Sequence, residues 1–181
     1  MGGFGSAPSG GHNSGRRRTC LTWCATATRS SGWAVNFDLT SGYYHCTIRE
    51  ESTEFLGFRV DAADGSTRWY KFTSLPFGLV TAPFEFDRLV KVLVRHWRLA
   101  DEASLVQYLD DVLAVSDDRD ALRSYAQRML HDFESVGFCI NVDKSELEPV
   151  DCVTFLGTIC CFRTGQFRAP QTRLAKIKAA V

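Results

Sequence analysis

Two adjacent aspartates interrupt an apolar stretch of the chain, and they constrain the fold more than any other feature of the sequence. Residues 105–109 and 112–115 are short runs of the type found in β-strands, and Asp110 and Asp111 stand between them. A third aspartate, Asp38, ends another apolar run. Because burying an unpartnered carboxylate is unfavourable, acids at these positions imply pairing or metal binding. We therefore expect the three acids at neighbouring strand ends, where their hard oxygen ligands suit divalent cations.

The spacing of apolar residues predicts an alternation of strands and helices. A helix is predicted from Pro83 to residue 98, and a second one, capped by Asp117-Asp118, is predicted to run to about residue 136 before Gly137 ends it. Apolar and β-branched runs predict strands at 33–39, 54–60, 68–72, 105–109, 112–115 and 138–142, a β-rich stretch at 153–167, and the start of a helix at 170–181. This order predicts an α+β fold in which helices pack on one face of an antiparallel sheet.

Charge is sorted along the chain, although 21 Lys and Arg balance 21 Asp and Glu. Residues 1–30 carry four basic residues and no acid, and residues 162–181 carry five basic residues and no acid. The segment 31–161 therefore has a net charge of −9, which bound divalent cations would partly offset. No uninterrupted apolar run approaches the roughly 18–20 residues of a membrane span, so none is predicted.

The predicted helix from Pro83 carries basic residues on the side opposite its apolar face. A solvated face is the simpler interpretation of this stripe, and contact with a phosphate backbone is the alternative. Its members are Arg88, Lys91, Arg95 and Arg98.

Seven cysteines are scattered through the sequence, mostly within apolar stretches. An odd, scattered set suits reduced thiols in an intracellular protein better than a disulfide framework. Cys20 and Cys24 lack a second ligand pair at zinc-site spacing.

Residues 1–32 are rich in Gly, Ser, Thr and Ala, and they lack apolar periodicity. We expect a disordered or non-native leader here. A transit peptide would share the acid-free composition, but an amphipathic helix is not evident.

The surroundings of the three acids resemble the palm domain of reverse transcriptases, whereas an isolated Asp-Asp pair in a turn is usually only solvated. Five segments match that family's motifs in the family's order. They are DLTSGYYH at 38–45, LPFGL at 75–79 with Ala82-Pro83 and Phe86, YLDD at 108–111, the segment 137–145, and FLG at 155–157. The match is closest to polymerases of LTR-type and DIRS-type retroelements. The resemblance implies a polymerase palm with an RRM/ferredoxin-like core.

The resemblance also implies roles for the acids. Asp38 and Asp110 would ligate two Mg²⁺ ions, for which Mn²⁺ can substitute, and Asp111 would support the second metal. The backbone carbonyl of Leu39 would complete that metal's ligand shell. Lys144 matches the position that acts as general acid toward pyrophosphate, although a lysine in a polar loop is more often merely solvated.

Other motif residues would contact the nucleotide and the primer. Tyr43 matches the steric gate against a ribose 2′-hydroxyl, with an ordinary core aromatic as the alternative. Phe77 and Gly78 would let the backbone approach the incoming nucleotide, since glycine removes the Cβ obstacle. The primer and template would meet Tyr108 and the hairpin formed by Phe155, Leu156 and Gly157.

We therefore expect a leader at 1–32, a palm with its primer-grip hairpin at 33–168, and the start of a thumb or connection helix at 169–181. The expected function is that of an RNA-directed DNA polymerase domain of a retrotransposon, transferring dNMP from dNTP to a primer 3′-hydroxyl. Its partners would be an RNA or DNA template, a DNA primer, and the fingers, thumb and ribonuclease H segments of a larger polyprotein.

No fingers motif is recognisable in 1–32, so we expect weak or no activity from the chain alone. The alternative is an inactive retroelement remnant that at most binds nucleic acid. An RRM-like RNA reader would not need three clustered acids.

Overall fold

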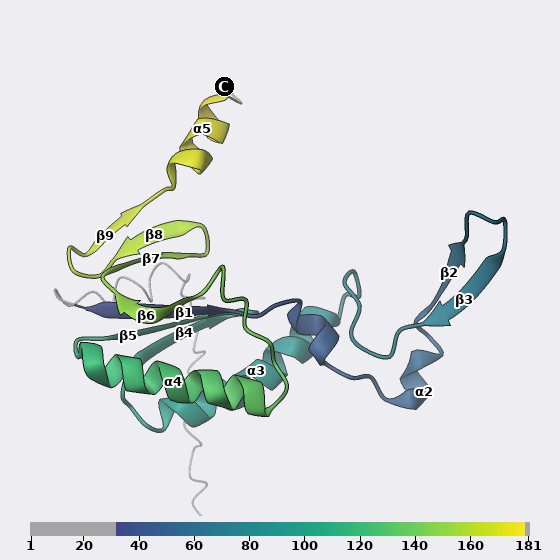
Figure 1. Ribbon diagram of the computed structural model, residues 1–181, viewed down its shortest axis with the longest axis horizontal. Coiled ribbons are helices and arrows are strands. Elements are labelled where there is room, and N and C mark those ends of the chain that lie inside the picture. The colour runs from purple at the N-terminus through teal and green to yellow at the C-terminus, as the bar shows by residue number, and fades with distance from the viewer. Residues whose placement is uncertain (1–31, 180–181) are drawn as a thin grey trace, which may run out of the picture.

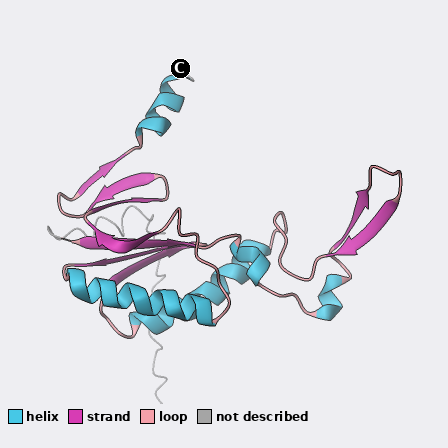
Figure 2. Ribbon diagram, viewed as in Figure 1, coloured by secondary structure: helices cyan, strands magenta, loops and turns pink. Residues whose placement is uncertain are grey.

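The computed structural model describes residues 32–179 as a mixed succession of strands and helices (Figures 1 and 2). In chain order the elements are β1 (Trp33–Asp38), the 3-10 helix η1 (Gly42–His45), α2 (Glu50–Thr53), β2 (Gly57–Asp61), β3 (Thr67–Lys71), α3 (Ala82–Arg98), β4 (Ser104–Tyr108), β5 (Asp111–Ser116), α4 (Arg119–Ser135), β6 (Glu146–Val150), β7 (Cys152–Phe155), β8 (Thr158–Cys161), β9 (Gln166–Arg168) and α5 (Gln171–Ala179).

A four-stranded antiparallel sheet with the order β4-β5-β1-β6 forms the centre of the fold. Helices α3 and α4 lie on one face of this sheet (Figure 1). Alternate residues of β1 point to that face, where Phe37 packs against Phe133 of α4 with ring centroids 5.7 Å apart. Phe86 of α3 is fully buried in the same cluster. The predicted α+β class, with helices on one face of an antiparallel sheet, is confirmed.

The opposite face of the central sheet is covered by the three strands β7-β8-β9, which form a sheet of their own (Figure 1). Ala34 and Leu113 from the central sheet share a second buried cluster with Phe155 and Phe162. The stretch predicted as β-rich at 153–167 therefore completes a three-layer arrangement, because it buries the side of the sheet that the helices leave open.

The two long helices lie within one or two residues of their predicted bounds. Pro83 occupies the first turn of α3, where its missing N–H is tolerated. Asp118 caps α4, accepting hydrogen bonds from the backbone N–H groups of Asp120 and Ala121, both at 3.0 Å. These end signals and the apolar spacing explain why the helices could be predicted.

Local contacts engage most of the basic stripe on α3. Arg88 pairs with Glu85 at 2.9 Å, Lys91 pairs with Asp87, and Arg98 donates to the carbonyl of Leu105. This pattern favours the solvated face over contact with a phosphate backbone.

The predicted strand at 138–142 is wrong. Within that stretch, which the structure describes in full, only Ile140 forms a β-bridge, with Leu39. The strand that pairs with β1 on the side away from β5 is β6. Asn36 explains the difference: its buried amide accepts the N–H of Glu146 at 3.0 Å and donates to the carbonyl of Lys144 at 3.4 Å. A buried polar side chain thus selects the polar segment as the neighbour of β1.

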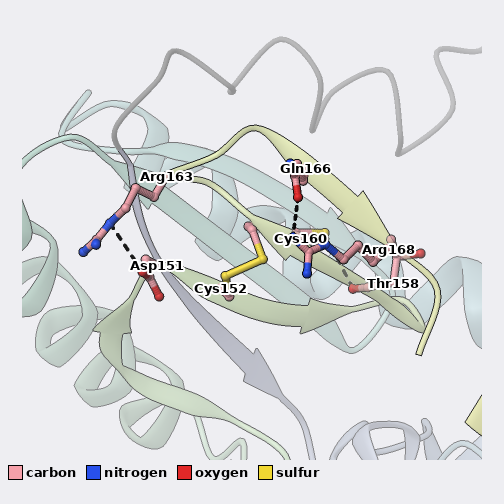
Figure 3. Close-up of a disulfide and its surroundings, with 8 residues drawn as sticks. Asp151, Cys152, Thr158, Cys160, Arg163, Gln166 and Arg168 are labelled. Atoms are coloured by element: carbon pink, nitrogen blue, oxygen red, sulfur yellow. Dashed lines mark hydrogen bonds and ion pairs between the residues drawn. A yellow bond between two sulfur atoms is a disulfide. The ribbon is translucent and has the colours of Figure 1, made fainter. Parts of the chain in front are cut away.

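The expectation of reduced thiols is wrong for Cys152 and Cys161, which form a disulfide between β7 and β8 (Figure 3). They stand directly opposite each other in the strand register, with Cα atoms 4.1 Å apart, so the pairing of the strands brings the two sulfurs together. Cys46 and Cys139 are thiols, and Cys160 donates its S–H to the carbonyl of Thr158. Cys20 and Cys24 lie outside the described residues.

The predicted hairpin near 54–72 forms and projects away from the central sheet (Figure 1). Every residue of β2 and β3 is exposed, and the Trp69 side chain is 74% exposed. The turn between the strands includes Gly65 at φ 80°, a conformation that favours glycine.

Within residues 32–179, no helix has both the length and the apolar character needed to cross a membrane. Nearly all of the predicted leader, residues 1–31, and the last two residues of the predicted C-terminal helix lie outside the described part.

Candidate active site

The three predicted acids gather at one end of the central sheet. Asp38 ends β1 and stands opposite Asp111, the first residue of β5. Asp111 also stands opposite Tyr108, so Leu109 and Asp110 form a two-residue turn between β4 and β5. The N–H of Leu39 donates to the carbonyl of Asp110 at 3.2 Å, which ties this turn to β1. The antiparallel register therefore brings together acids that are more than 70 residues apart in sequence.

Negative charge in this cluster is only partly balanced. Burial and, to a lesser extent, the charges of Asp110 and Asp38 raise the pKa of Asp111, the Lys144 ammonium opposes them, and the resulting pKa is about 6. Burial also raises the pKa of Asp38; Lys144 lowers it, the charge of Asp110 raises it, and a side-chain hydrogen bond from Asn141 lowers it. The acids are thus electrostatically coupled, as expected of carboxylates prepared to share cations.

A polar loop after α4 closes on Asp38. The N–H of Asn141 donates to the carbonyl of Asp38 at 2.8 Å, and the N–H of Asp38 donates to the hydroxyl of Ser145 at 3.0 Å. Lys144 lies in the same loop, close enough for its charge to affect both Asp38 and Asp111. The motif at 137–145 predicts no individual role for Asn141 or Ser145, and the structure places both against the backbone of Asp38. Their signal is the row of polar residues directly after the apolar run that starts at Phe138.

The donor set suits hard divalent cations in its chemistry. It comprises three carboxylates and the carbonyl of Leu39, which accepts no backbone hydrogen bond from any residue in 32–179. Within the same residues, no three or more His, Cys, Asp or Glu side chains are arranged as a ready-made metal cage. Burial and the charges of Asp110 and Asp38 raise the pKa of Asp111, so a bound cation would lower the cost of keeping this carboxylate ionised.

Tyr43 lies in η1, next to the acids and between two aromatic rings. Its ring centroid is 4.9 Å from that of Phe77 and 5.2 Å from that of Phe86. Burial raises the pKa of its hydroxyl, and the charges of Asp110 and Tyr108 raise it further. Gly42 precedes it, and a Cβ at Gly42 would lie only 2.5 Å from Cζ of Phe86. The glycine thus allows Phe86 to support the tyrosine.

Gly78 has a backbone conformation that favours glycine, and its predicted role in the approach to a nucleotide stays a prediction. No described heavy atom lies within 4 Å of a Cβ built there, apart from its own chain neighbours. Its φ of 91° lies in the region that favours glycine, so the turn conformation explains this residue among the protein atoms. Phe77 beside it is 59% exposed and offers a ring to solvent.

The residues predicted to meet the primer are distributed over two elements. Tyr108 is half exposed and stands beside the acid turn. Phe155 is buried in the second core cluster, whereas Leu156 and Gly157, both with positive φ, form the turn between β7 and β8. Phe155 therefore serves the core, and contact of this hairpin with a primer stays a prediction.

Sequence comparisons relate the chain to reverse transcriptases and to Pol polyproteins. A sequence profile described as "Reverse transcriptase (RNA-dependent DNA polymerase)" matches residues 7–160, a range that begins inside the predicted leader. The Gag-Pol polyprotein of avian reticuloendotheliosis virus is 28% identical over 127 residues, which make up 69% of this chain and 11% of that protein. The retrovirus-related Pol polyprotein from transposon opus of Drosophila melanogaster is 30% identical over 125 residues, or 69% of this chain and 12% of that protein. The chain thus matches about a tenth of the length of these relatives.

Solved structures share the fold at lower identity. The foamy viral protease-reverse transcriptase in complex with dsDNA superposes with a TM-score of 0.72 at 20% identity, covering 94% of this chain and 32% of that one. The same viral protein in complex with an RNA/DNA hybrid gives a TM-score of 0.68 at 20% identity, covering 86% and 20% of the two chains.

Proposed function

The chain belongs to the reverse transcriptase (RNA-dependent DNA polymerase) family, and from this premise we propose that it carries the polymerase centre of a retroelement polyprotein. The reaction is attack of a primer 3′-hydroxyl on the α-phosphorus of a dNTP. A P–O bond forms, the bond between the α and β phosphates breaks, and pyrophosphate leaves. The observation that carries this proposal is the register that sets Asp38 opposite Asp111, with Asp110 in the adjoining turn.

Asp38 and Asp110 are the proposed ligands of two Mg²⁺ or Mn²⁺ ions, with Asp111 and the carbonyl of Leu39 completing the set. Bound ions of this kind activate the attacking hydroxyl and neutralise the leaving pyrophosphate. The protein's part is to hold the carboxylates in place: Asn141 and Ser145 fix the backbone of Asp38, and Leu39 fixes the carbonyl of Asp110.

The remaining motif residues have proposed roles around the nucleotide. Tyr43, wedged between Phe77 and Phe86, would exclude a ribose 2′-hydroxyl. Phe77 and Gly78 would let the backbone approach the incoming nucleotide, and the positive φ of Gly78 supports a glycine in this turn. Lys144 already lies close to the acids, and it would give a proton to the pyrophosphate as it leaves.

The proposed partners are an RNA or DNA template, a DNA primer and dNTPs. Two features of the structure support contact with nucleic acid near the centre: the half-exposed ring of Tyr108 and the exposed ring of Phe77. Tyr108, with Phe155, Leu156 and Gly157 in the β7–β8 hairpin, is the proposed primer and template contact. The relatives are far longer polyproteins, so we also propose that other polyprotein segments cooperate with this one. The palm would span 33–168, with a leader at 1–32 before it and the start of a thumb or connection helix at 169–181.

Primer extension tests the proposed activity. The full 181-residue chain would be supplied with a poly(rA)/oligo(dT) substrate, labelled dTTP and Mg²⁺ or Mn²⁺. We expect slow incorporation that Asp110→Asn abolishes. Asp143→Asn is a matched control, because it removes a carboxylate from an exposed loop residue that makes no ion pair or side-chain hydrogen bond with any other residue in 32–179. Template binding with no incorporation under either metal would instead assign the chain to the inactive remnant.

The Tyr43 role is tested by substrate choice. Tyr43→Ala is expected to raise incorporation of ribonucleotides relative to deoxynucleotides while the deoxynucleotide reaction persists. Unchanged discrimination would leave Tyr43 as an ordinary core aromatic.

A further inference from the structure

The turn that carries Asp110 contains a strained residue. Leu109 has a φ of 53°, in the left-handed region that non-glycine residues rarely adopt. Two-residue hairpin turns with positive φ at their first position normally place Gly, Asn or Asp there. A leucine in this conformation costs about 1–2 kcal/mol, so neighbouring contacts must hold the turn in shape.

Two contacts hold the turn, one on each of its carbonyl groups. The N–H of Leu39 donates to the carbonyl of Asp110 from the side of β1, as described above. From the other side, the side-chain amide of Gln107 donates to the carbonyl of Leu109 at 2.9 Å. The same Nε2 atom donates to Oδ1 of Asp87 at 3.0 Å. Both amide hydrogens of Gln107 are therefore used.

Asp87 anchors this amide to helix α3. Its side chain is largely buried, at 24% exposure, and it also pairs with Lys91 one turn further along the helix. The aspartate thus fixes the Gln107 amide from the helix side, and the amide in turn fixes the strained turn. Asp87 and Gln107 border an open hollow of about 510 Å³. Its lining also includes Phe84, Tyr108 and Leu109. Water can therefore reach the Leu109 carbonyl if the amide is removed.

We propose that Gln107 is a positioning residue for the reaction, holding Asp110 in place through the carbonyl of Leu109 while Asp87 holds Gln107. This inference rests on the proposed function, because positioning matters only if Asp110 acts on the metals. Gln107 touches neither metal nor substrate in this assignment. Its effect passes through the backbone of the turn.

Amide hydrogen exchange in the ¹⁵N-labelled 181-residue chain tests the positioning without any need for turnover. The exchange rate of the Leu39 N–H reports directly on the turn, because this N–H donates to the backbone carbonyl of Asp110. Gln107→Met keeps the length of the side chain and removes both donors. We expect Leu39 exchange to accelerate about five-fold, the ratio that loss of one ordinary hydrogen bond gives. Phe162 belongs to the other core cluster, and its N–H donates to the backbone carbonyl of Asp151 at 2.8 Å. The exchange rate of this N–H should not change.

Gln127→Met is the matched control, since Gln127 is exposed on α4 and makes no side-chain hydrogen bond in the described part of the chain. It should change neither rate. Equal acceleration of Leu39 and Phe162 in Gln107→Met would show a general loss of stability and overturn the proposal. Unchanged exchange of Leu39 would overturn it as well.

Primer extension supplies the second readout. Gln107→Met is expected to lower kcat about ten-fold and to leave the KM for dTTP within two-fold, because the nucleotide contacts remain while the acid is displaced. A change in KM alone would contradict positioning of Asp110. If the wild-type chain incorporates no nucleotide, the proposed function fails for this chain, and the exchange of Leu39 still decides the role of Gln107 in the turn.

Discussion

Asp111→Asn should stabilise the metal-free fold, although it removes a residue of the candidate active site. The carboxylate of Asp111 is half-buried beside Asp110 and Asp38. Asparagine keeps the shape of the side chain and removes the charge, which burial and these neighbours both disfavour. We therefore expect the free energy of unfolding to rise at neutral pH in the presence of a chelator.

The raised pKa of Asp111 sets the size of the effect. Its value of about 6 in the fold, against 3.8 for an unperturbed aspartate, corresponds to about 3 kcal/mol at about 1.4 kcal/mol per pKa unit. Solvent screening of a half-buried group reduces this to about 1–2 kcal/mol. Because the folded-state pKa is above the unfolded value, the folded state binds the proton more tightly. Ionisation thus destabilises the fold, with no effect below pH 3.8 and the full effect above pH 6.

Urea denaturation followed by the fluorescence of the buried Trp97 measures this difference. In EDTA at pH 7.5 we expect Asp111→Asn to exceed the wild type by about 1–2 kcal/mol, and at pH 5 by roughly half as much. Asp143→Asn, in the exposed loop, is the matched control and should differ little from the wild type at either pH. Added Mg²⁺ should narrow the gap, because cations stabilise the charged cluster and bind the variant less well.

A variant less stable than the wild type at pH 7.5, or a gap independent of pH, would refute the electrostatic reasoning. The first result would mean that the carboxylate makes a favourable contact in the fold. The second would mean that neither burial nor the neighbouring charges disfavour the ionised form of Asp111 in the fold.

Three further changes test separate parts of the fold. Gly42→Ala would place a Cβ 2.5 Å from Cζ of Phe86 and should lower stability by about 1–3 kcal/mol, seen as a lower Tm. Asp118→Ala removes the cap of α4 and should lower stability by about 1 kcal/mol in urea denaturation, with little change in the slope. Cys152→Ser should lower stability by about 2–3 kcal/mol and make the Tm insensitive to dithiothreitol, whereas the wild type should melt earlier in dithiothreitol; equal sensitivity of both proteins would show that the bond to Cys161 does not contribute.

The helices could be predicted because their signals are local. Pro83 and Asp118 mark the starts of α3 and α4. The apolar residues that follow each start keep a helical spacing over four or more turns, which only a helix explains. The hairpin around Gly65 was predictable for the same reason, since its turn residues lie next to one another in sequence.

Strand partners could not be predicted locally. The apolar run after Phe138 looks more like a strand than the segment from Glu146, which contains Pro149 and alternating acids. The choice is made by the buried amide of Asn36, 110 residues away in sequence from its partner Glu146. The disulfide between Cys152 and Cys161 escaped prediction in the same way, because only the strand register shows that the two cysteines face each other.

The candidate site was predictable as a set of residues and not as a geometry. Resemblance to a family singled out Asp38, Asp110 and Asp111, and the register explains why they meet. The positive φ of Leu109 and the contacts of Gln107 have no sequence signature. They arise where a helix residue, a strand residue and a turn come together in space.

The projecting hairpin has a consequence for how the protein behaves at high concentration. Within residues 32–179, β2 and β3 pair only with each other, so both outer edges of this ribbon remain open to another strand. Such edges promote association between copies, and positively charged side chains counteract it by repulsion. Arg59, Arg68 and Lys71 supply positive charge along the ribbon, of which Arg59 is paired with Asp61 and Lys71 with Glu50. The solubility of the chain therefore depends on residues that contribute nothing to its core, and neutralising them would favour aggregation while leaving the central sheet intact.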